Sequence, residues 1–279
     1  PLEQTYTLRD TQFYALALGL GADPLDAGQL RYVYEGVDGH ALCALPTLAN
    51  VLAYPGFWAR EDDTGIDWRR LVHAEQQITL HAPLPAAARV VGRNRVSGLW
   101  DRGEGKGALL QQARDIHDAS SGRRLATVIQ LSLLRGDGGF GPGGSEDAPP
   151  EPHAMPAPER APDHVCELPT LPQSALLYRL CGDHNPLHSD PELARTAGFH
   201  RPILPGMATM GIAAHAVLRA VAQYDAARIT GMRVRFTNPA LPGDTLRTEM
   251  WVDGPRVSMR STAVERKVIV LNNAWVDLR

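Results

Sequence analysis

The chain has 279 residues, of which 44% are hydrophobic and 21% charged, as in an ordinary globular protein, and this excludes a wholly disordered chain. The formal net charge of −3 gives no polybasic surface for a nucleic acid or an anionic membrane. The three cysteines, Cys43, Cys166 and Cys181, are too few and too scattered for a disulfide framework or a closed zinc site. Because the N-terminus also lacks a signal-peptide pattern, we expect a reducing, cytoplasmic location.

The first half predicts a short helix followed by strands. Pro46 can start a helix and Pro55 should end it, so fewer than ten residues can be helical between them. Strand-like runs cover Gln76–His81, Arg89–Val96, Gly107–His117 and Arg124–Leu134. A short helix beside a sheet leaves space in an apolar interior, which is either a packing defect or a pocket.

A segment rich in glycine and proline, Gly136 to Asp163, separates the two halves. It has no apolar periodicity and cannot bury enough surface to offset the entropy that ordering would cost, so it predicts a linker. We therefore divide the chain into an N-terminal unit over residues 1–135, a linker over 136–165 and a C-terminal unit over 166–279.

The second half predicts a long central helix and three further strands. The stretch from Met207 to about Tyr224 is apolar on most faces, which is typical of a buried helix rather than of a membrane span, because Arg219 interrupts it. Strand-like runs follow at Thr245–Val252, Arg256–Val264 and Lys267–Val276. The turns between them are too short for a crossover helix, so the strands should be antiparallel.

The two halves repeat one pattern. Leu45-Pro46-Thr47 corresponds to Leu204-Pro205-Gly206, and Pro83-Leu84-Pro85 corresponds to the later run Pro239–Gly243, in the same order and at similar spacings. This pattern favours an internal duplication over two unrelated α+β domains. A long buried helix wrapped by an antiparallel sheet is the hot-dog architecture, so the sequence predicts a double hot dog in which the first helix is short.

The densest group of reactive side chains lies in Gly182–His188, between two predicted helices. Asp183 and His188 are five residues apart and could not share one helix face, but Pro186 breaks the helix and lets a loop bring them together. A carboxylate beside an imidazole can position and activate a water molecule. The plainer interpretation, in which Asp183 caps a turn and His188 is a hydrogen-bonded core residue, stays open at this point. Zinc is disfavoured, because Pro186 separates His184 from His188 and no glutamate follows His184.

Gly206 lies at the start of the long helix, behind Pro205. Its N–H is one of the unpaired donors at a helix N-terminus, and a glycine allows a ligand to approach the backbone closely. The position suits an oxyanion hole for a thioester oxygen that gains negative charge. A plain helix start with a small first residue is the alternative.

The segment Tyr178–His188 resembles the signature of the (R)-specific enoyl-CoA hydratases, the hydratase 2 or MaoC-like dehydratase family. Weaker similarity extends over nearly the whole chain. It includes Leu45-Pro46-Thr47 and Gly138–Gly141, a run that is similar to the joint in the two-unit hydratase 2 of eukaryotic multifunctional β-oxidation enzymes. The resemblance implies an α+β, double hot-dog fold with one active site per chain, because the first half has no copy of the signature.

The resemblance also implies roles for individual residues. The family's catalytic acid and histidine fall on Asp183 and His188. Its asparagine falls on Asn185, and the glycine whose N–H meets the thioester carbonyl falls on Gly206. The family's other substrate contacts fall on His73, on Ala74 (where glycine is commoner), on Arg102 (where a lysine can stand) and on Phe236.

The implied activity is the reversible hydration of a trans-2-enoyl-CoA to a (3R)-3-hydroxyacyl-CoA by a homodimer, without a metal or an organic cofactor. In the resembling two-unit enzymes the missing first helix opens a tunnel for a long acyl tail, so we expect medium to long chains, unless Phe57 or Trp58 fills the space. The main alternatives are a dehydratase acting on acyl carrier protein and a hydratase for a small branched or dicarboxylic acyl-CoA. A hot-dog thioesterase and a non-catalytic acyl-CoA-binding module fit the Asp183 and His188 pair less well.

Overall fold

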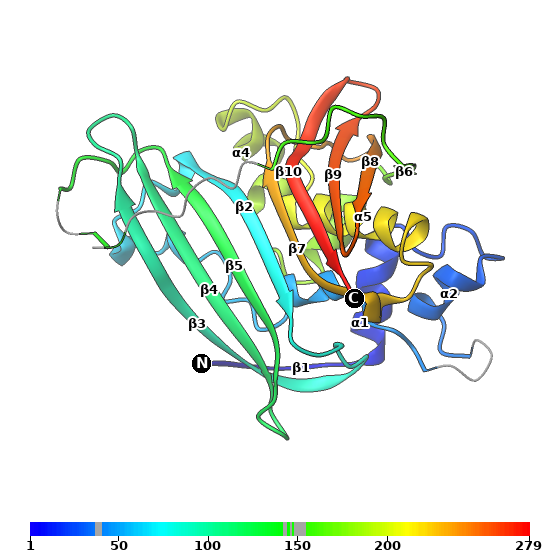
Figure 1. Ribbon diagram of the computed structural model, residues 1–279. Coiled ribbons are helices and arrows are strands. Elements are labelled where there is room, and N and C mark those ends of the chain that lie inside the picture. The colour runs from blue at the N-terminus through cyan, green and yellow to red at the C-terminus, as the bar shows by residue number, and fades with distance from the viewer. Residues whose placement is uncertain (37–40, 142–143, 146, 148–154) are drawn as a thin grey trace.

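The computed structural model describes residues 1–36, 41–141, 144–145, 147 and 155–279, so the middle of the predicted linker lies outside the described residues. Ten strands of the described chain form one continuous antiparallel sheet, in the order β1-β3-β4-β5-β2-β7-β10-β9-β8-β6 (Figure 1). The strands are β1 (Leu2–Tyr6), β2 (Leu71–Leu80), β3 (Ala88–Asp101), β4 (Ala108–Asp118), β5 (Arg124–Leu134), β6 (His164–Pro169), β7 (Ile229–Phe236), β8 (Thr245–Asp253), β9 (Arg256–Ala263) and β10 (Val268–Leu278).

The strands of the two halves follow the same order. In the first half they pair as β1-β3-β4-β5-β2, and in the second as β6-β8-β9-β10-β7, so the second strand of each half lies innermost. The halves meet where β2 pairs with β7, from Glu75 opposite Arg235 to Thr79 opposite Gly231. This repeated order is the double hot-dog arrangement that the sequence predicts.

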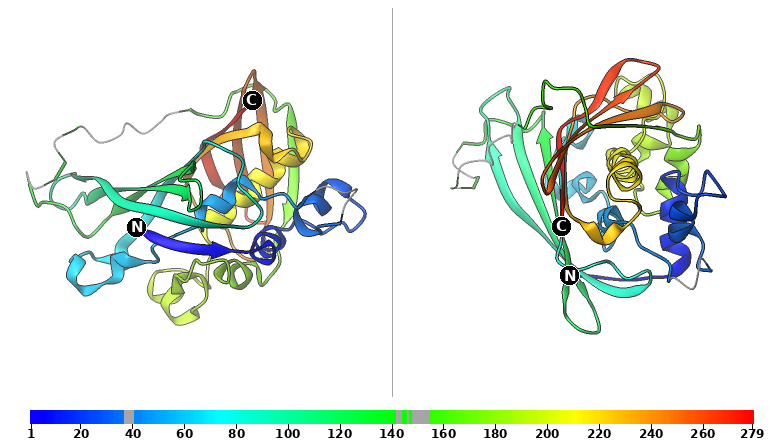
Figure 2. Two further views of the ribbon diagram at one scale, coloured as in Figure 1. Left: turned by 90° about the horizontal axis from the view of Figure 1, so that it is seen from below. Right: turned by 45° about the vertical axis from the view of Figure 1, so that its right-hand side comes forward.

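The core of the second unit is the helix α5 (Gly206–Ala220), which lies against the concave side of the sheet (Figure 2). It begins directly after Pro205, and its residues from Met207 to Leu218 are all buried, because apolar side chains occupy every face. The prediction that this helix continues to Tyr224 is wrong. Gln223 and Tyr224 adopt left-handed backbone angles (φ 54° and 57°), and this turn packs the ring of Tyr224 against that of Tyr32, with centroids 6.5 Å apart.

In the first unit only a short 3-10 helix, η1 (Pro46–Asn50), takes the corresponding place, as Pro46 and Pro55 predict. Its last carbonyl groups, those of Ala49 and Asn50, accept hydrogen bonds from Nη2 of Arg114 on β4, at 3.2 and 2.7 Å. A strand side chain therefore satisfies carbonyl groups that a longer helix would pair internally.

The remaining helices are short and lie outside the sheet. They are α1 (Leu8–Ala17), α2 (Ala27–Val33), α3 (Ser174–Arg179), α4 (Pro191–Thr196) and the 3-10 turns η2 (Trp58–Arg60), η3 (Asp62–Thr64), η4 (Trp68–Arg70), η5 (Pro186–His188) and η6 (Ala226–Arg228). Of the helices in the described part of the chain, none has the length and hydropathy that a membrane span requires.

His215 on α5 predicts a pH dependence of stability. The side chain is 1% exposed, and burial lowers its pKa from 6.5 to about 4. Because the unfolded chain binds this proton near pH 6.5 and the folded chain only near pH 4, the free energy of unfolding should fall as the pH drops through this window. We expect His215 to account for a loss of up to about 3 kcal/mol. Denaturant unfolding of wild type and His215→Gln across this range should give a shallower decline for the variant; equal declines would contradict the assignment.

Candidate active site

The loop that carries Asp183 and His188 is built from local turns. It leaves α3 through Gly182, whose φ of 123° suits a glycine, and enters η5 at Pro186. The Asp183 carboxylate accepts a hydrogen bond from the N–H of Asn185 (3.3 Å), and the Asn185 side chain accepts one from the N–H of Leu187 (3.1 Å). Asn185 therefore holds the loop in shape by capping η5.

Asp183 and His188 are both buried, at 5% and 8% exposure. Nδ1 of His188 lies 3.0 Å from the carbonyl oxygen of Ile203, which can only accept a hydrogen bond. The proton of the neutral imidazole is therefore on Nδ1, and Nε2 keeps its lone pair. A buried histidine oriented in this way can take a proton from a water molecule.

His73 lies beside this pair, on β2. The charges of Asp183 and His188 both act on its pKa, and its ring packs edge-on against that of Phe236, with centroids 4.8 Å apart. Burial lowers the pKa of His73 to about 4, so the ring is neutral at pH 7. Its Nε2 donates to Oε1 of Gln76 at 2.9 Å, which fixes the orientation of the ring.

Ala74 forms a β-bulge in strand β2. The pairing of β2 with β5 shifts register between His73 and Glu75, which leaves Ala74 without a partner in that ladder. Bulges of this kind re-aim the neighbouring side chains and are common beside active sites.

Gly206 meets Phe236 at the N-terminus of α5. A Cβ atom on Gly206 would lie 3.1 Å from the Phe236 ring, a tight contact that would make the ring shift slightly. The N–H of Gly206 has no hydrogen-bond acceptor in the described part of the chain. Phe236 also packs on His73, so contacts link Gly206 to the histidine whose pKa is affected by the charges of Asp183 and His188.

Arg102 lies apart from this group. It is exposed on the hairpin between β3 and β4, and the strands β4 and β5 separate that hairpin from β2. In the residues that the structure describes, its side chain shares no hydrogen bond or ion pair with the other candidate site residues. Within the same residues, no three His, Cys, Asp or Glu side chains converge as a metal site would require.

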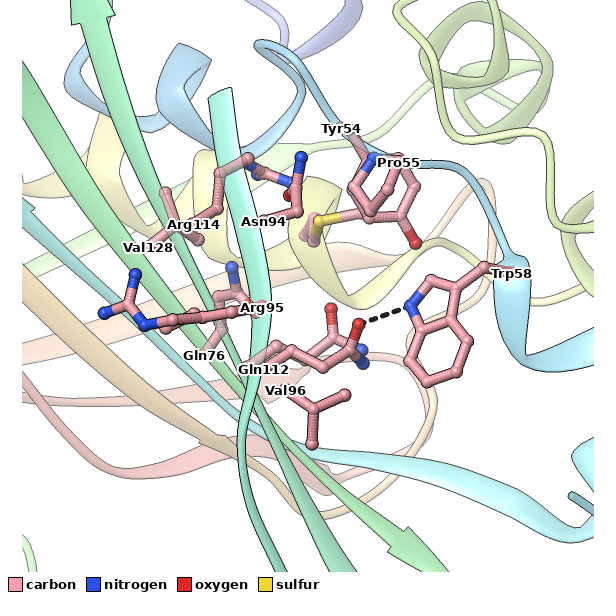
Figure 3. Close-up of a pocket in the computed structure, with 13 residues that line it drawn as sticks. Tyr54, Pro55, Trp58, Gln76, Asn94, Arg95, Val96, Gln112, Arg114 and Val128 are labelled. Carbon is pink, nitrogen blue, oxygen red and sulfur yellow. Dashed lines mark hydrogen bonds between the residues drawn. The ribbon is translucent and has the colours of Figure 1, made fainter. Parts of the chain in front are cut away.

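A cavity of about 270 Å³ adjoins the site where the first unit lacks a long helix (Figure 3). Met207, next to Gly206, and Gln76, the hydrogen-bond partner of His73, both line it. Burial and the nearby charge of Asp183 raise the pKa of Tyr54, on the cavity wall, to about 12, so Tyr54 lies near the loop that carries Asp183. The expected space is therefore present as a cavity, and two of its lining residues adjoin the candidate site residues His73 and Gly206.

Neither aromatic residue that could have filled this space does so. Nε1 of Trp58 donates to Oε1 of Gln112 at 2.6 Å, which holds the indole against the wall. Phe57 packs edge-on against Trp68 instead. The cavity residues Tyr54, Gln112 and Arg114 are not apparent from the sequence, where Gln112 and Arg114 stand only as polar residues at alternate positions of the predicted strand Gly107–His117.

Comparison with known proteins agrees with these features over the whole chain. Residues 153–274 match the family described as "MaoC like domain", and residues 4–136 match "MFE-2 hydratase 2 N-terminal domain". The chain is 38% identical to "Enoyl-CoA hydratase 2, peroxisomal" of Arabidopsis thaliana, over 99% of this chain and 91% of that protein. It is 39% identical to "3-hydroxyacyl-thioester dehydratase Y" of Mycobacterium tuberculosis, over 95% of this chain and 88% of that protein.

Solved structures show the same likeness. The MaoC-like dehydratase from Phytophthora capsici superposes with a TM-score of 0.84 at 30% identity, covering 100% of this chain and 94% of that one. A Mycobacterium tuberculosis protein described as a double hot-dog fold superposes with a TM-score of 0.58 at 16% identity, which speaks for the fold alone. The chain belongs to the MaoC-like family of hydro-lyases, in the two-unit form of the enoyl-CoA hydratase 2 proteins.

Proposed function

We propose that this hydro-lyase adds water to a trans-2-enoyl-CoA and forms a (3R)-3-hydroxyacyl-CoA, with Asp183 and His188 as its catalytic residues. The observation that carries the proposal is the buried Asp183 and His188 pair on one loop, in which Nδ1 of His188 contacts the carbonyl oxygen of Ile203. The N–H of Gly206, which has no acceptor in the described part of the chain, adds to it. The names of the relatives support the reaction type, since one is an enoyl-CoA hydratase and another a 3-hydroxyacyl-thioester dehydratase.

In the proposed mechanism Asp183 and His188 together hold the attacking water. As the water oxygen bonds to C3, the pair takes one proton from the water and delivers one to C2 on the same face, so the pair ends in its starting protonation state. The N–H of Gly206 donates to the thioester oxygen while that oxygen carries enolate charge. The acid and base roles belong to the pair, because two coupled groups share their titration.

The cavity is the argument for proposing substrates with acyl chains of medium to long length, at least C8. It adjoins α5 next to Gly206 and occupies the place of the missing helix in the first unit. We expect kcat/KM for octenoyl-CoA and decenoyl-CoA to equal or exceed that for crotonyl-CoA, with the R product in each case. Hydration assays with chiral analysis of the 3-hydroxyacyl product test this; a sharp fall above C4 or an S product would contradict it.

The carrier is tested in the same assay. The same acyl group presented on CoA and on acyl carrier protein should react faster on CoA, and the reverse result would favour a carrier-protein dehydratase. The homodimer and the cofactor-free reaction stay predictions from the family resemblance, and the cytoplasmic location stays a prediction from the cysteines and the N-terminal sequence.

A further inference from the structure

The cavity beside the active site carries positive charge and no negative charge. Thirteen residues line it, among them two arginines and no aspartate or glutamate (Figure 3). The first arginine, Arg95, has a side chain that is 52% exposed and forms an ion pair with Asp115 at 2.6 Å. The second, Arg114, is 6% exposed and has no carboxylate partner among the described residues.

Arg114 is only partly satisfied by the protein. Its Nη2 donates to the carbonyl groups of Ala49 and Asn50, and its guanidinium carbon lies 5.3 Å from the centroid of the Tyr54 ring. Nε is fully buried and has no hydrogen-bond partner. Nη1 also has no partner among the described residues, but it is not fully buried. Burial lowers the pKa of Arg114 only to about 10, so the side chain is charged at neutral pH.

Other polar side chains also line the cavity, although most of its wall is apolar. Gln112 shares β4 with Arg114 and uses its carbonyl oxygen to accept from Trp58, which leaves its NH2 group as a donor (Figure 3). The lining amides of Gln130 and Asn94 already donate, to Oγ of Ser132 at 3.2 Å and to the carbonyl group of Ala53 at 3.3 Å. A purely alkyl tail would cover the donors of Arg114 and Gln112 without pairing them, and unpaired buried donors are costly.

We propose that this cavity receives a carboxylate at the far end of the acyl chain, so that the preferred substrate is an ω-carboxylated, medium-chain enoyl-CoA. Arg114 would supply the charge and Gln112 a neighbouring N–H donor. The inference rests on the proposed hydratase function and narrows its substrate class. Of the alternatives given above, it favours a dicarboxylic acyl-CoA. Its acyl chain must, however, be long enough to reach from the reaction centre into the cavity, rather than small.

The first test compares matched substrates on the wild-type protein. We expect kcat/KM for trans-2-decenedioyl-CoA to exceed that for trans-2-decenoyl-CoA about tenfold or more, because a charge-assisted hydrogen bond is stronger than a neutral one. Equal values, or a preference for the methyl-ended chain, would overturn the inference. Crotonyl-CoA distinguishes failure of the proposed hydratase function from failure of the proposed carboxylate preference. If neither crotonyl-CoA nor the longer thioesters react, the hydratase function is wrong. If they react without a preference for the carboxylate, only the further inference is wrong.

The second test removes the charge. Arg114→Gln should abolish the carboxylate preference by lowering kcat/KM for decenedioyl-CoA about tenfold or more, with a much smaller change for decenoyl-CoA. Arg95→Gln is the matched control, because it removes a positive charge at the same cavity that is exposed and already ion-paired; the preference should persist. A folded Arg114→Gln protein that keeps the preference would contradict the assignment.

A third test does not depend on the folding of the Arg114 variant, which loses the hydrogen bonds to η1. Gln112→Leu removes the neighbouring donor without touching those carbonyl groups, and it should reduce the preference severalfold. Free sebacate should also inhibit wild-type crotonyl-CoA hydration more strongly than free decanoate. The proposal would be contradicted if Gln112→Leu kept the full preference for decenedioyl-CoA over decenoyl-CoA and sebacate and decanoate inhibited equally.

Discussion

Replacing Asp183 by asparagine is expected to lower kcat for enoyl-CoA hydration by a factor of about 10²–10⁴, the usual contribution of a positioned acid or base. The amide has the size of the carboxylate and can still accept the hydrogen bond from Asn185 N–H, so the loop should keep its shape. It cannot take a proton at neutral pH, and at 5% exposure of Asp183 no bulk water replaces the lost group.

His188→Gln should cause a loss of the same order, because glutamine can still donate to the carbonyl of Ile203 but offers no basic nitrogen. The double variant should be little worse than either single one, since the two residues act as a unit. Loss of enoyl absorbance with crotonyl-CoA and decenoyl-CoA measures these effects.

The control for both variants is His184→Gln, which changes an exposed histidine of the same loop and should leave turnover nearly unchanged. Near wild-type activity in a folded Asp183→Asn or His188→Gln protein would show that the catalytic assignment is wrong. The plainer interpretation, in which the two residues only cap a turn and fill the core, predicts altered stability without this loss of kcat.

Gly206→Pro should lower kcat/KM by a factor of about 10²–10³ relative to Gly206→Ala, as expected when one oxyanion donor is lost. Position 206 is the first residue of α5, where proline is well tolerated. The preceding Pro205 already has φ −53° and ψ 136°, the extended conformation that a following proline requires. The helix should therefore survive the substitution while the N–H is removed.

Gly206→Ala separates this effect from crowding, because its Cβ would meet the Phe236 ring at 3.1 Å as the proline Cβ does, yet it keeps the N–H. Both variants should therefore shift Phe236, and only the proline should remove the donor. If the two variants have equal kcat/KM, the N–H of Gly206 does not stabilise the enolate. Circular dichroism and thermal unfolding check that both proteins are folded.

Features that depend on neighbouring residues could be read from the sequence. Asp190 caps α4 through the N–H groups of Glu192 and Leu193, as Asp-Pro at a helix start predicts. The loop over Gly182–His188, the short first helix and most strands of both halves follow from proline positions, turn residues and apolar runs.

Features set by distant contacts could not be predicted. The strands β1, β6 and β7 were missed, because two of them have only five or six residues and β7 carries a glycine and two arginines among its apolar positions. The end of α5 depends on the packing of Tyr224 against Tyr32 from the other half. The charge of the cavity was missed for the same reason, since Arg114 meets η1 across the fold.

The pairing of β2 with β7 also suggests a use for the first unit, which carries neither Asp183 nor His188. Taken apart, each half would present the inner strand as a bare edge, and an unpaired edge is a template on which another chain can add a strand. Five residue pairs now close both edges inside a single chain. The first unit thereby acts as a permanently attached partner that protects the inner edge of the second unit from aggregation, whatever its part in the proposed reaction.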